Sequence, residues 1–101
     1  MEKTYTKTHA TYLDDHGIIH IEVIEGSHIE LNCLIELKKI IRQMAMKKKE
    51  AVLVEAGAHH TITNEAMNYL KEEILDKNRL ATAIVTDKLG IRIMIDYFTK
   101  V

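Results

Sequence analysis

The residues of this sequence that could perform chemistry gather in one loop that follows a short apolar run. His59 and His60 are adjacent, and Thr61 and Thr63 supply the nearest hydroxyl groups. Imidazole side chains act as general bases and bind zinc, while hydroxyl groups can act as nucleophiles or carry a phosphate. We therefore define a candidate interaction or ligand loop from Gly57, His59, His60, Thr61 and Thr63.

A metal centre is not the favoured interpretation of this loop. Zinc sites need three or four ligands at defined geometry, and adjacent residues rarely both point at one ion. Glu55, Glu65 and a distant histidine are the remaining candidate ligands, and their spacing is not compact. The sequence has neither a His-Glu-x-x-His pattern nor paired cysteines. We predict polar loop histidines, no metal and no cofactor.

Catalysis is not indicated elsewhere in the sequence. Cys33 lies beside Leu34 in an expected helix, where a small buried thiol is the common outcome. The pair Asp14 and Asp15 is better explained as the tip of a hairpin. The sequence lacks a Walker loop and a GxGxxG element. We predict no catalytic residue and a non-enzymatic protein; an enzyme that uses one of the two loop histidines is an alternative.

The candidate loop is expected to lie between a buried strand and an amphipathic helix. Residues 51–54 form a continuous apolar run, typical of a strand covered on both faces. Asn64 begins a helix that reaches about Leu75, and Thr63 is its expected N-cap. In open α/β sheets, ligand and partner sites gather where loops leave the carboxyl ends of strands. A functional surface is therefore expected at this loop.

Patterns elsewhere predict the remaining elements. Residues 5–13 and 18–24 form an expected hairpin around Gly17, with Ile19 and Ile21 on its core face. After the turn at residues 25–27, apolar residues recur at helical spacing: Leu31, Leu34, Leu37, Ile41 and Met44. A strand is expected at residues 80–86 and a third helix at about 88–99. The order β-β-α-β-α-β-α predicts one α/β domain over residues 1–101. Its expected sheet is mixed and mostly parallel, with an N-terminal antiparallel hairpin and helices packed on it.

This order resembles a known fold through four segments. They are the hairpin strand with residues 17–19, a helix after residues 29–31, residues 51–55 followed by 63–66, and residues 81–85 before a small polar turn. The chain resembles the SpoIIAA-like fold of STAS domains over about residues 10 to 98. It is most similar to small bacterial STAS/SEC14-like proteins. The resemblance implies a small, dimeric, non-enzymatic domain.

The resemblance does not extend to a phosphorylation switch. Anti-sigma-factor antagonists of the STAS type have an Asp-Ser-Ser-Gly-like phosphoacceptor turn after the central strand, whereas residues 55–61 contain no serine. Thr61 and Thr63 are the nearby hydroxyls, and cap or turn roles are expected for both. Phosphorylation of either threonine is the alternative.

Composition restricts the partners and the location. The 14 basic and 15 acidic residues give no strong field toward nucleic acid or an anionic membrane. The single cysteine, Cys33, suits a reducing compartment. The first residues lack the pattern of a secretory signal, and no apolar segment approaches the roughly 20 residues of a membrane span. We expect a cytoplasmic protein that does not bind nucleic acid.

The expected third helix indicates self-association. Apolar side chains point in nearly every direction around it, and such a helix is normally buried most of the way round. A homodimer is predicted, with a candidate interface of Ile91, Met94, Ile95 and Phe98. A different protein partner or a bound lipid could cover the same face. The leading functional prediction is a regulatory or protein-interaction domain of the STAS-like type. The alternative is a small-molecule or lipid-binding module with an apolar pocket near residues 57–63.

Overall fold

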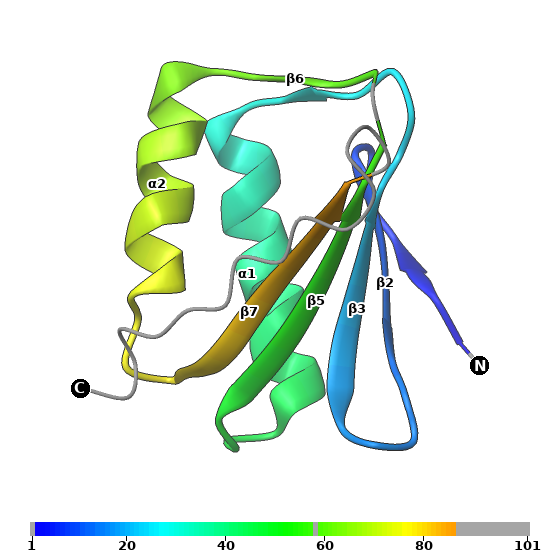
Figure 1. Cartoon of the computed structure of the whole chain (residues 1–101), viewed down its shortest axis with the longest axis vertical. Helices are drawn as coiled ribbons and strands as arrows, with labels where there is room; N and C mark the ends of the chain where they lie inside the picture. The colour runs from blue at the N-terminus through cyan, green and yellow to red at the C-terminus, as the bar shows by residue number, and fades with distance from the viewer. Residues whose placement is uncertain (1, 58, 87–101) are drawn as a thin grey trace.

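A computed structural model describes residues 2–57 and 59–86, and in it a mixed sheet carries two helices (Figure 1). The main sheet has the spatial order β1 (Thr4–Tyr5), β2 (His9–Leu13), β3 (Ile18–Val23), β5 (Glu50–Ala56) and β7 (Arg79–Thr86). The helices are α1 (Leu31–Ala45) and α2 (Asn64–Ile74). Two short strands, β4 (His28–Ile29) and β6 (Thr61–Ile62), form a second, parallel sheet. The predicted α/β class is confirmed.

The N-terminal hairpin is held by its turn residues. Asp14 Oδ1 accepts hydrogen bonds from the backbone N–H groups of His16 and Ile18, at 2.8 and 2.9 Å. Gly17 has a φ of 82°, which glycine adopts without steric cost. The strands on either side, β2 and β3, pair antiparallel with Leu13 opposite Ile19. The predicted hairpin is therefore confirmed.

The rest of the sheet differs in part from the sequence-based expectation. Strands β3, β5 and β7 are parallel neighbours, as predicted. The expected first strand is interrupted, because Thr6 Oγ1 accepts from the backbone N–H of His9 at 3.0 Å and turns the chain between β1 and β2. In the described main sheet, two antiparallel strand pairs accompany two parallel ones, so the sheet is mixed, and its antiparallel part is the N-terminal segment with the hairpin. The short strands β4 and β6 were not predicted.

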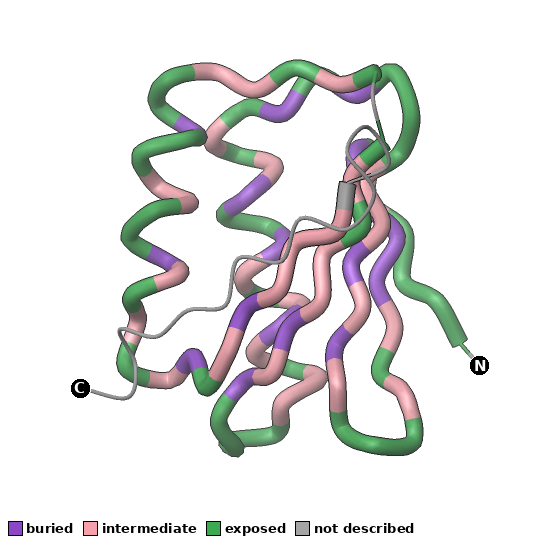
Figure 2. The backbone as a smooth tube through the Cα atoms, in the orientation of Figure 1, coloured by how far each residue is buried: buried purple, intermediate pink, exposed green. Residues whose placement is uncertain are grey.

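The core lies between the sheet and the helices, and Figure 2 marks its buried positions along the strands and along α1. Alternation places Ile19, Ile21 and Val52 on the helix-facing side of the sheet. From the other layer, α1 contributes three buried residues at helical spacing and α2 contributes one: Leu34, Leu37, Ile41 and Ala66. The prediction that Leu34, Leu37 and Ile41 of the first helix face the core is thus confirmed.

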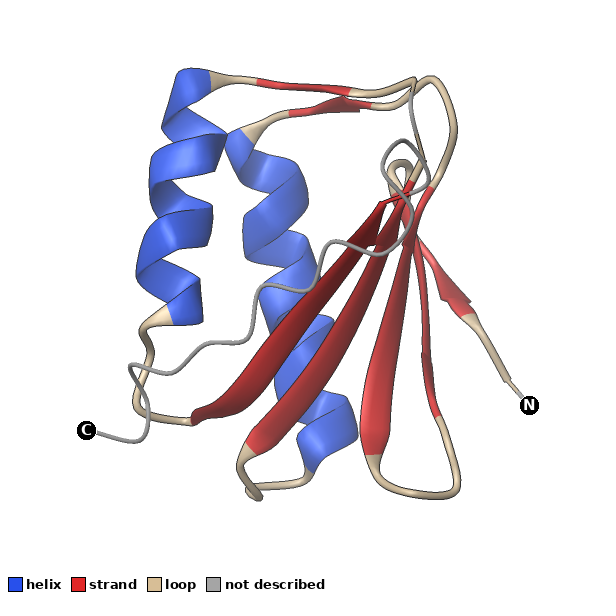
Figure 3. Ribbon diagram, in the orientation of Figure 1, coloured by secondary structure: helices blue, strands red, loops and turns tan. Residues whose placement is uncertain are grey.

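Figure 3 shows α1 and α2 on the same side of the sheet. Alternate residues of β5 point the other way, where Leu53 is half-buried and Glu55 is exposed. The expected cover on both faces of this strand is therefore not found within residues 2–57 and 59–86. The expected third helix, with Ile91, Met94, Ile95 and Phe98, lies outside the described residues.

Candidate functional site

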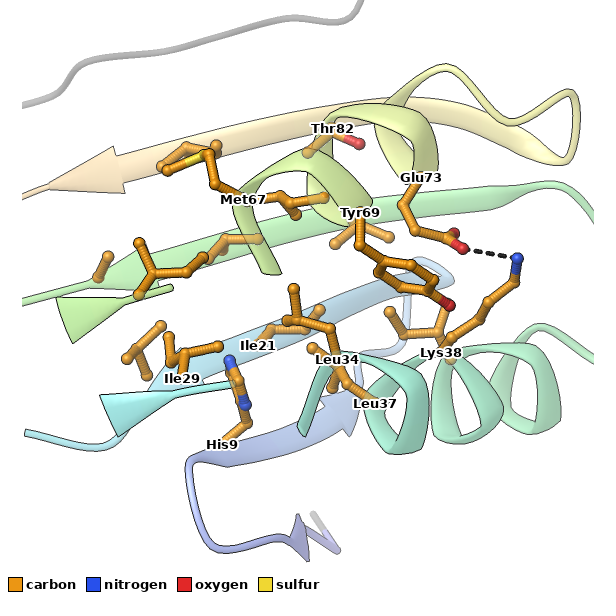
Figure 4. A pocket seen from close by; sticks show the side chains of 18 of the residues that line it. His9, Ile21, Ile29, Leu34, Leu37, Lys38, Met67, Tyr69, Glu73 and Thr82 are labelled. Atoms are coloured by element: carbon orange, nitrogen blue, oxygen red, sulfur yellow. Dashed lines mark ion pairs between the residues drawn. The ribbon is translucent and has the colours of Figure 1, made fainter. Parts of the chain in front are cut away.

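A cavity of about 240 Å³ lies between the sheet and the two helices (Figure 4). Strands β3, β5 and β7 form its floor, and α1 and α2 form its walls. Most of the surface is apolar, including Ile21, Val54, Leu34, Leu37, Met67 and Leu70. This cavity is the candidate functional site of the described chain.

The local sequence patterns explain why apolar groups line the cavity. In β5, Val52, Val54 and Ala56 are separated by single residues, so all three face the helices. Parallel pairing with β7 sets Ile84 beside Val54. The strand floor continues as far as the start of the candidate loop, because Ala56 is the last residue of β5. The small side chain of this alanine fills little of the space beneath the loop.

The candidate loop closes one end of this cavity through β6. The backbone N–H of Thr61 donates to the Ser27 carbonyl at 2.9 Å, and that of Thr63 donates to the Ile29 carbonyl at 3.0 Å. These bonds join β6 to the segment that leads from β3 into α1. Ile62, between the two threonines, lines the cavity. A pairing between distant segments thus fixes the loop against the cavity.

The residues of the candidate loop separate into different roles. His60 lines the cavity, and its Nδ1 donates to the Gly57 carbonyl at 2.9 Å. His59 is exposed and does not line the cavity. Thr61 Oγ1 lies 2.7 Å from Nδ1 of His28 on the paired strand. Thr63 accepts from the Ala66 backbone N–H at 3.1 Å and caps α2, as predicted. The structure brings one predicted histidine to the cavity and places both threonines in local turn and cap contacts.

His9 is a cavity residue that the sequence-based analysis missed. It is only 3% exposed, and its Nδ1 lies 2.6 Å from Thr8 Oγ1. Burial lowers the pKa of His9 to about 4, and the nearby His60 contributes further. The sequence predicted one unbroken strand over residues 5–13, on the basis of its threonine and tyrosine content. The sequence therefore did not reveal the turn at Thr6, after which β2 begins at His9.

The other end of the cavity is polar but its charges are paired. Lys38 of α1 forms an ion pair with Glu73 of α2, and this hydrogen bond raises the pKa of Lys38. Arg79 donates to Glu50 Oε1 at 3.1 Å and to Thr82 Oγ1 at 2.9 Å. Both cations are already matched by carboxylates. This end therefore offers little attraction for a further anion.

A polar cluster around His20 lies on β2, β3 and the turn between them, outside the cavity. The rings of Tyr12 and His20 stack with centroids 4.5 Å apart, and His20 Nε2 lies 2.8 Å from Asp14 Oδ2. The hydrogen bond from His20 lowers the pKa of Asp14 to about 2. Because the other oxygen of Asp14 holds the hairpin turn, the predicted hairpin role of Asp14 is confirmed. Across the described residues, no three His, Cys, Asp or Glu side chains form a metal-binding group.

A family model with the description "Domain of unknown function (DUF7793)" matches residues 11–101. The chain belongs to this family. The match includes every residue of the cavity wall except His9, which lies two residues before it. No curated protein and no solved structure matches the chain. No helix in the described ranges is long and apolar enough to cross a membrane.

Proposed function

We propose that this DUF7793 domain is a non-enzymatic regulatory domain of the STAS-like type that works by binding an apolar group. The observation that carries the proposal is the apolar cavity between the sheet and the helices. Ligand sites are usually concave, largely apolar and lined by a few polar groups. The cavity has this composition, and the candidate loop forms one end of it.

The size of the cavity favours a small occupant. A ~150 Å³ apolar cavity can hold benzene, so by proportion about 240 Å³ accommodates about ten non-hydrogen atoms. A small molecule with a short apolar chain fits that volume, as does one apolar side chain of a partner protein. Either occupant agrees with a regulatory domain that works by binding.

The STAS-like part of the proposal is supported by the strand arrangement. An N-terminal antiparallel hairpin leads into parallel strands β3, β5 and β7, and helices α1 and α2 connect them. The resemblance is to bacterial proteins, and the single Cys33 suits a reducing compartment, so a bacterial cytoplasm is the proposed location. The serine-free turn after β5 separates this domain from phosphorylated STAS antagonists.

Catalysis receives less support than binding from the same residues. The hydroxyls of Thr61 and Thr63 are engaged in local hydrogen bonds. At the polar end of the cavity, Lys38 and Glu73 form an ion pair with each other, so neither charge is free to act on a substrate. Two hydroxyls lie beside imidazoles, Thr8 at 2.6 Å from Nδ1 of His9 and Thr61 at 2.7 Å from Nδ1 of His28, but neither threonine lines the cavity, where a substrate for covalent catalysis would bind.

Self-association remains part of the proposed function. The apolar segment with Ile91, Met94, Ile95 and Phe98 is the proposed interface of a homodimer. A two-fold pair is the commonest closed arrangement of identical chains. Regulation could then combine ligand binding with a dimer contact.

The binding proposal can be tested with toluene, a probe without hydrogen-bonding groups. Methyl NMR signals from Leu34, Leu37 and Val54 should shift on titration with toluene, because these residues line the cavity. Ala56→Met should weaken this response by filling the cavity. Ala51→Met is a matched control, because Ala51 belongs to the same strand but points to the opposite face.

Two results would count against the binding proposal. One is a wild-type protein whose cavity methyl signals do not respond to toluene, as expected if another part of the chain fills the cavity. The other is an equal loss of response in the two alanine variants, since the effect would then not depend on the cavity.

A further inference from the structure

The cavity has one end whose polar groups are not matched by opposite charges. His9 and His60 both line this end, and the pKa of His9 responds to His60. Figure 4 shows the ring of His9 beside Ile29 and Leu34, in the wall of the cavity. At the far end, by contrast, Lys38 is paired with Glu73. The two ends therefore differ in the ligand groups that they can accept.

The hydrogen bonds of the two histidines leave one nitrogen available on each ring. The Gly57 carbonyl can only accept, so Nδ1 of His60 carries a hydrogen and Nε2 of the neutral ring is an acceptor. His9 uses Nδ1 with the Thr8 hydroxyl, which can either donate or accept. Within the described part of the chain, neither Nε2 atom has a hydrogen-bond partner.

We propose that the ligand of this cavity is a medium-chain carboxylic acid whose carboxyl group hydrogen-bonds to His9 and His60. The inference rests on the proposed binding function and specifies its ligand class. A carboxyl group has two oxygens, so each ring can contact its own oxygen. In its protonated form the group is both donor and acceptor, which matches the two available nitrogens. The hydrocarbon chain then lies along the apolar wall.

The length of the cavity agrees with this orientation. Its floor follows β5 from Val52 to Ala56, a distance of about 13 Å at the usual rise per residue of a strand. A carboxyl group at His60 places the chain over Val54 and toward Leu37. The buried ion pair of Glu50 and Arg79 lies at the opposite end and needs no ligand.

Octanoic acid tests the inference because it has about the ten non-hydrogen atoms that the cavity accommodates. Methyl octanoate carries the same chain but lacks the acidic proton and charge. By isothermal titration calorimetry at about pH 4.5, where much of a carboxylic acid is protonated, octanoic acid should bind about tenfold or more tightly than methyl octanoate, the effect of a hydrogen bond to an ionisable head group. Methyl NMR of Leu37 and Val54 locates both ligands in the cavity.

Histidine variants test whether the tighter binding of octanoic acid than of methyl octanoate depends on the contact with the cavity histidines. His60→Leu should clearly reduce the ratio of the two affinities, because it removes one of the two ring nitrogens that contact the carboxyl group while keeping an apolar wall. His59→Leu is the matched control and should retain the wild-type ratio, since His59 is exposed and does not line the cavity.

The possible outcomes separate the inference from the proposed function. Equal affinities of the acid and the ester in wild-type protein, with both ligands in the cavity, overturn the carboxyl contact and leave apolar binding intact. An equal effect of the His59 and His60 variants also overturns it. If the cavity methyl groups respond to neither octyl compound nor to toluene, the proposed binding function fails as well.

Discussion

At the scale of single residues, the buried His9 has the clearest physical consequence. Burial disfavours the charged imidazole, and the pKa of His9 falls from 6.5 to about 4. The folded protein therefore holds a neutral imidazole in its core near neutral pH. Its available nitrogen can serve a ligand in the cavity without the cost of an unpaired buried charge.

His9 should make the folded state sensitive to mild acid. Between pH 6.5 and about 4, the unfolded chain binds a proton at His9 that the folded chain does not. The free energy of unfolding should therefore fall as the pH decreases through this range, by up to about 1.4 kcal/mol per pH unit. His9→Gln should flatten this dependence in urea denaturation. Asp14, whose pKa is lowered to about 2, changes the free energy of unfolding only at pH values below this range. Equal slopes for variant and wild type would contradict the assignment to His9.

A buried ion pair gives a second prediction at this scale. Glu50 is 3% exposed and lies between Arg79, at 3.1 Å, and Arg42, at 3.2 Å. Glu50→Ala should lower the free energy of unfolding by about 3–5 kcal/mol, because it leaves a buried guanidinium unpaired. Lys3→Ala, which breaks an exposed pair with Glu22, should change the free energy of unfolding little, because solvent screens this pair. Chemical denaturation of both variants measures the difference, and similar losses would argue against this role for Glu50.

At the scale of elements, the start of α2 joins the candidate loop to the second sheet. Thr63 accepts from the Ala66 N–H at 3.1 Å and donates its own N–H to the Ile29 carbonyl at 3.0 Å. The first bond caps the helix and the second holds the preceding strand β6 against β4. One residue thus fixes both the helix and the loop that closes the cavity.

Substitutions at Thr63 should separate the cap from the strand contact. Thr63→Ala should cost about 1 kcal/mol of stability because it removes the side-chain acceptor. Thr63→Asp should be tolerated, since aspartate accepts the same bond and favours the positive end of the helix. Thr61→Ala is the control, because Thr61 is exposed and does not cap the helix. Unfolding of the aspartate variant with an unaffected alanine variant would exclude the cap.

At the scale of the whole molecule, the layers leave part of the sheet without a helix. Both described helices pack on one face, and Leu53 and Ala83 on the other face are only half-buried. In the sequence after Thr86, residues 89–99 are mostly apolar and carry charge only at Arg92 and Asp96. A large apolar surface is normally covered by another element or another chain, and we expect the same for the helix-free face of this sheet.

The predicted homodimer can be tested through the apolar segment after β7. Analytical ultracentrifugation at micromolar concentration should give the mass of two chains for the wild type. Met94→Asp or Ile95→Asp should shift the protein toward the monomer, because each places a charge in the proposed interface. Leu80→Asp, outside the proposed interface, is a control for general effects of a new charge. A strictly monomeric wild type would remove the dimer from the proposal.

The sequence by itself determined the features that depend on neighbouring residues. Alternation assigned Ile19 and Ile21 to the core, and helical spacing did the same for Leu34 and Leu37. The N-cap at Thr63 was also predictable, because steric preference and hydrogen bonding within a turn decide it. These features follow from local geometry.

Only the tertiary structure decided which polar residues meet. His9 and His60 lie far apart in the sequence, and they line one cavity because β2 and the segment that leads into β6 reach the same end of the molecule. Glu50 and Arg79 pair because β5 and β7 are parallel neighbours. The two-residue strands β4 and β6 are too short to show a periodicity. Such contacts depend on how distant segments pack, and no pattern within one segment specifies them.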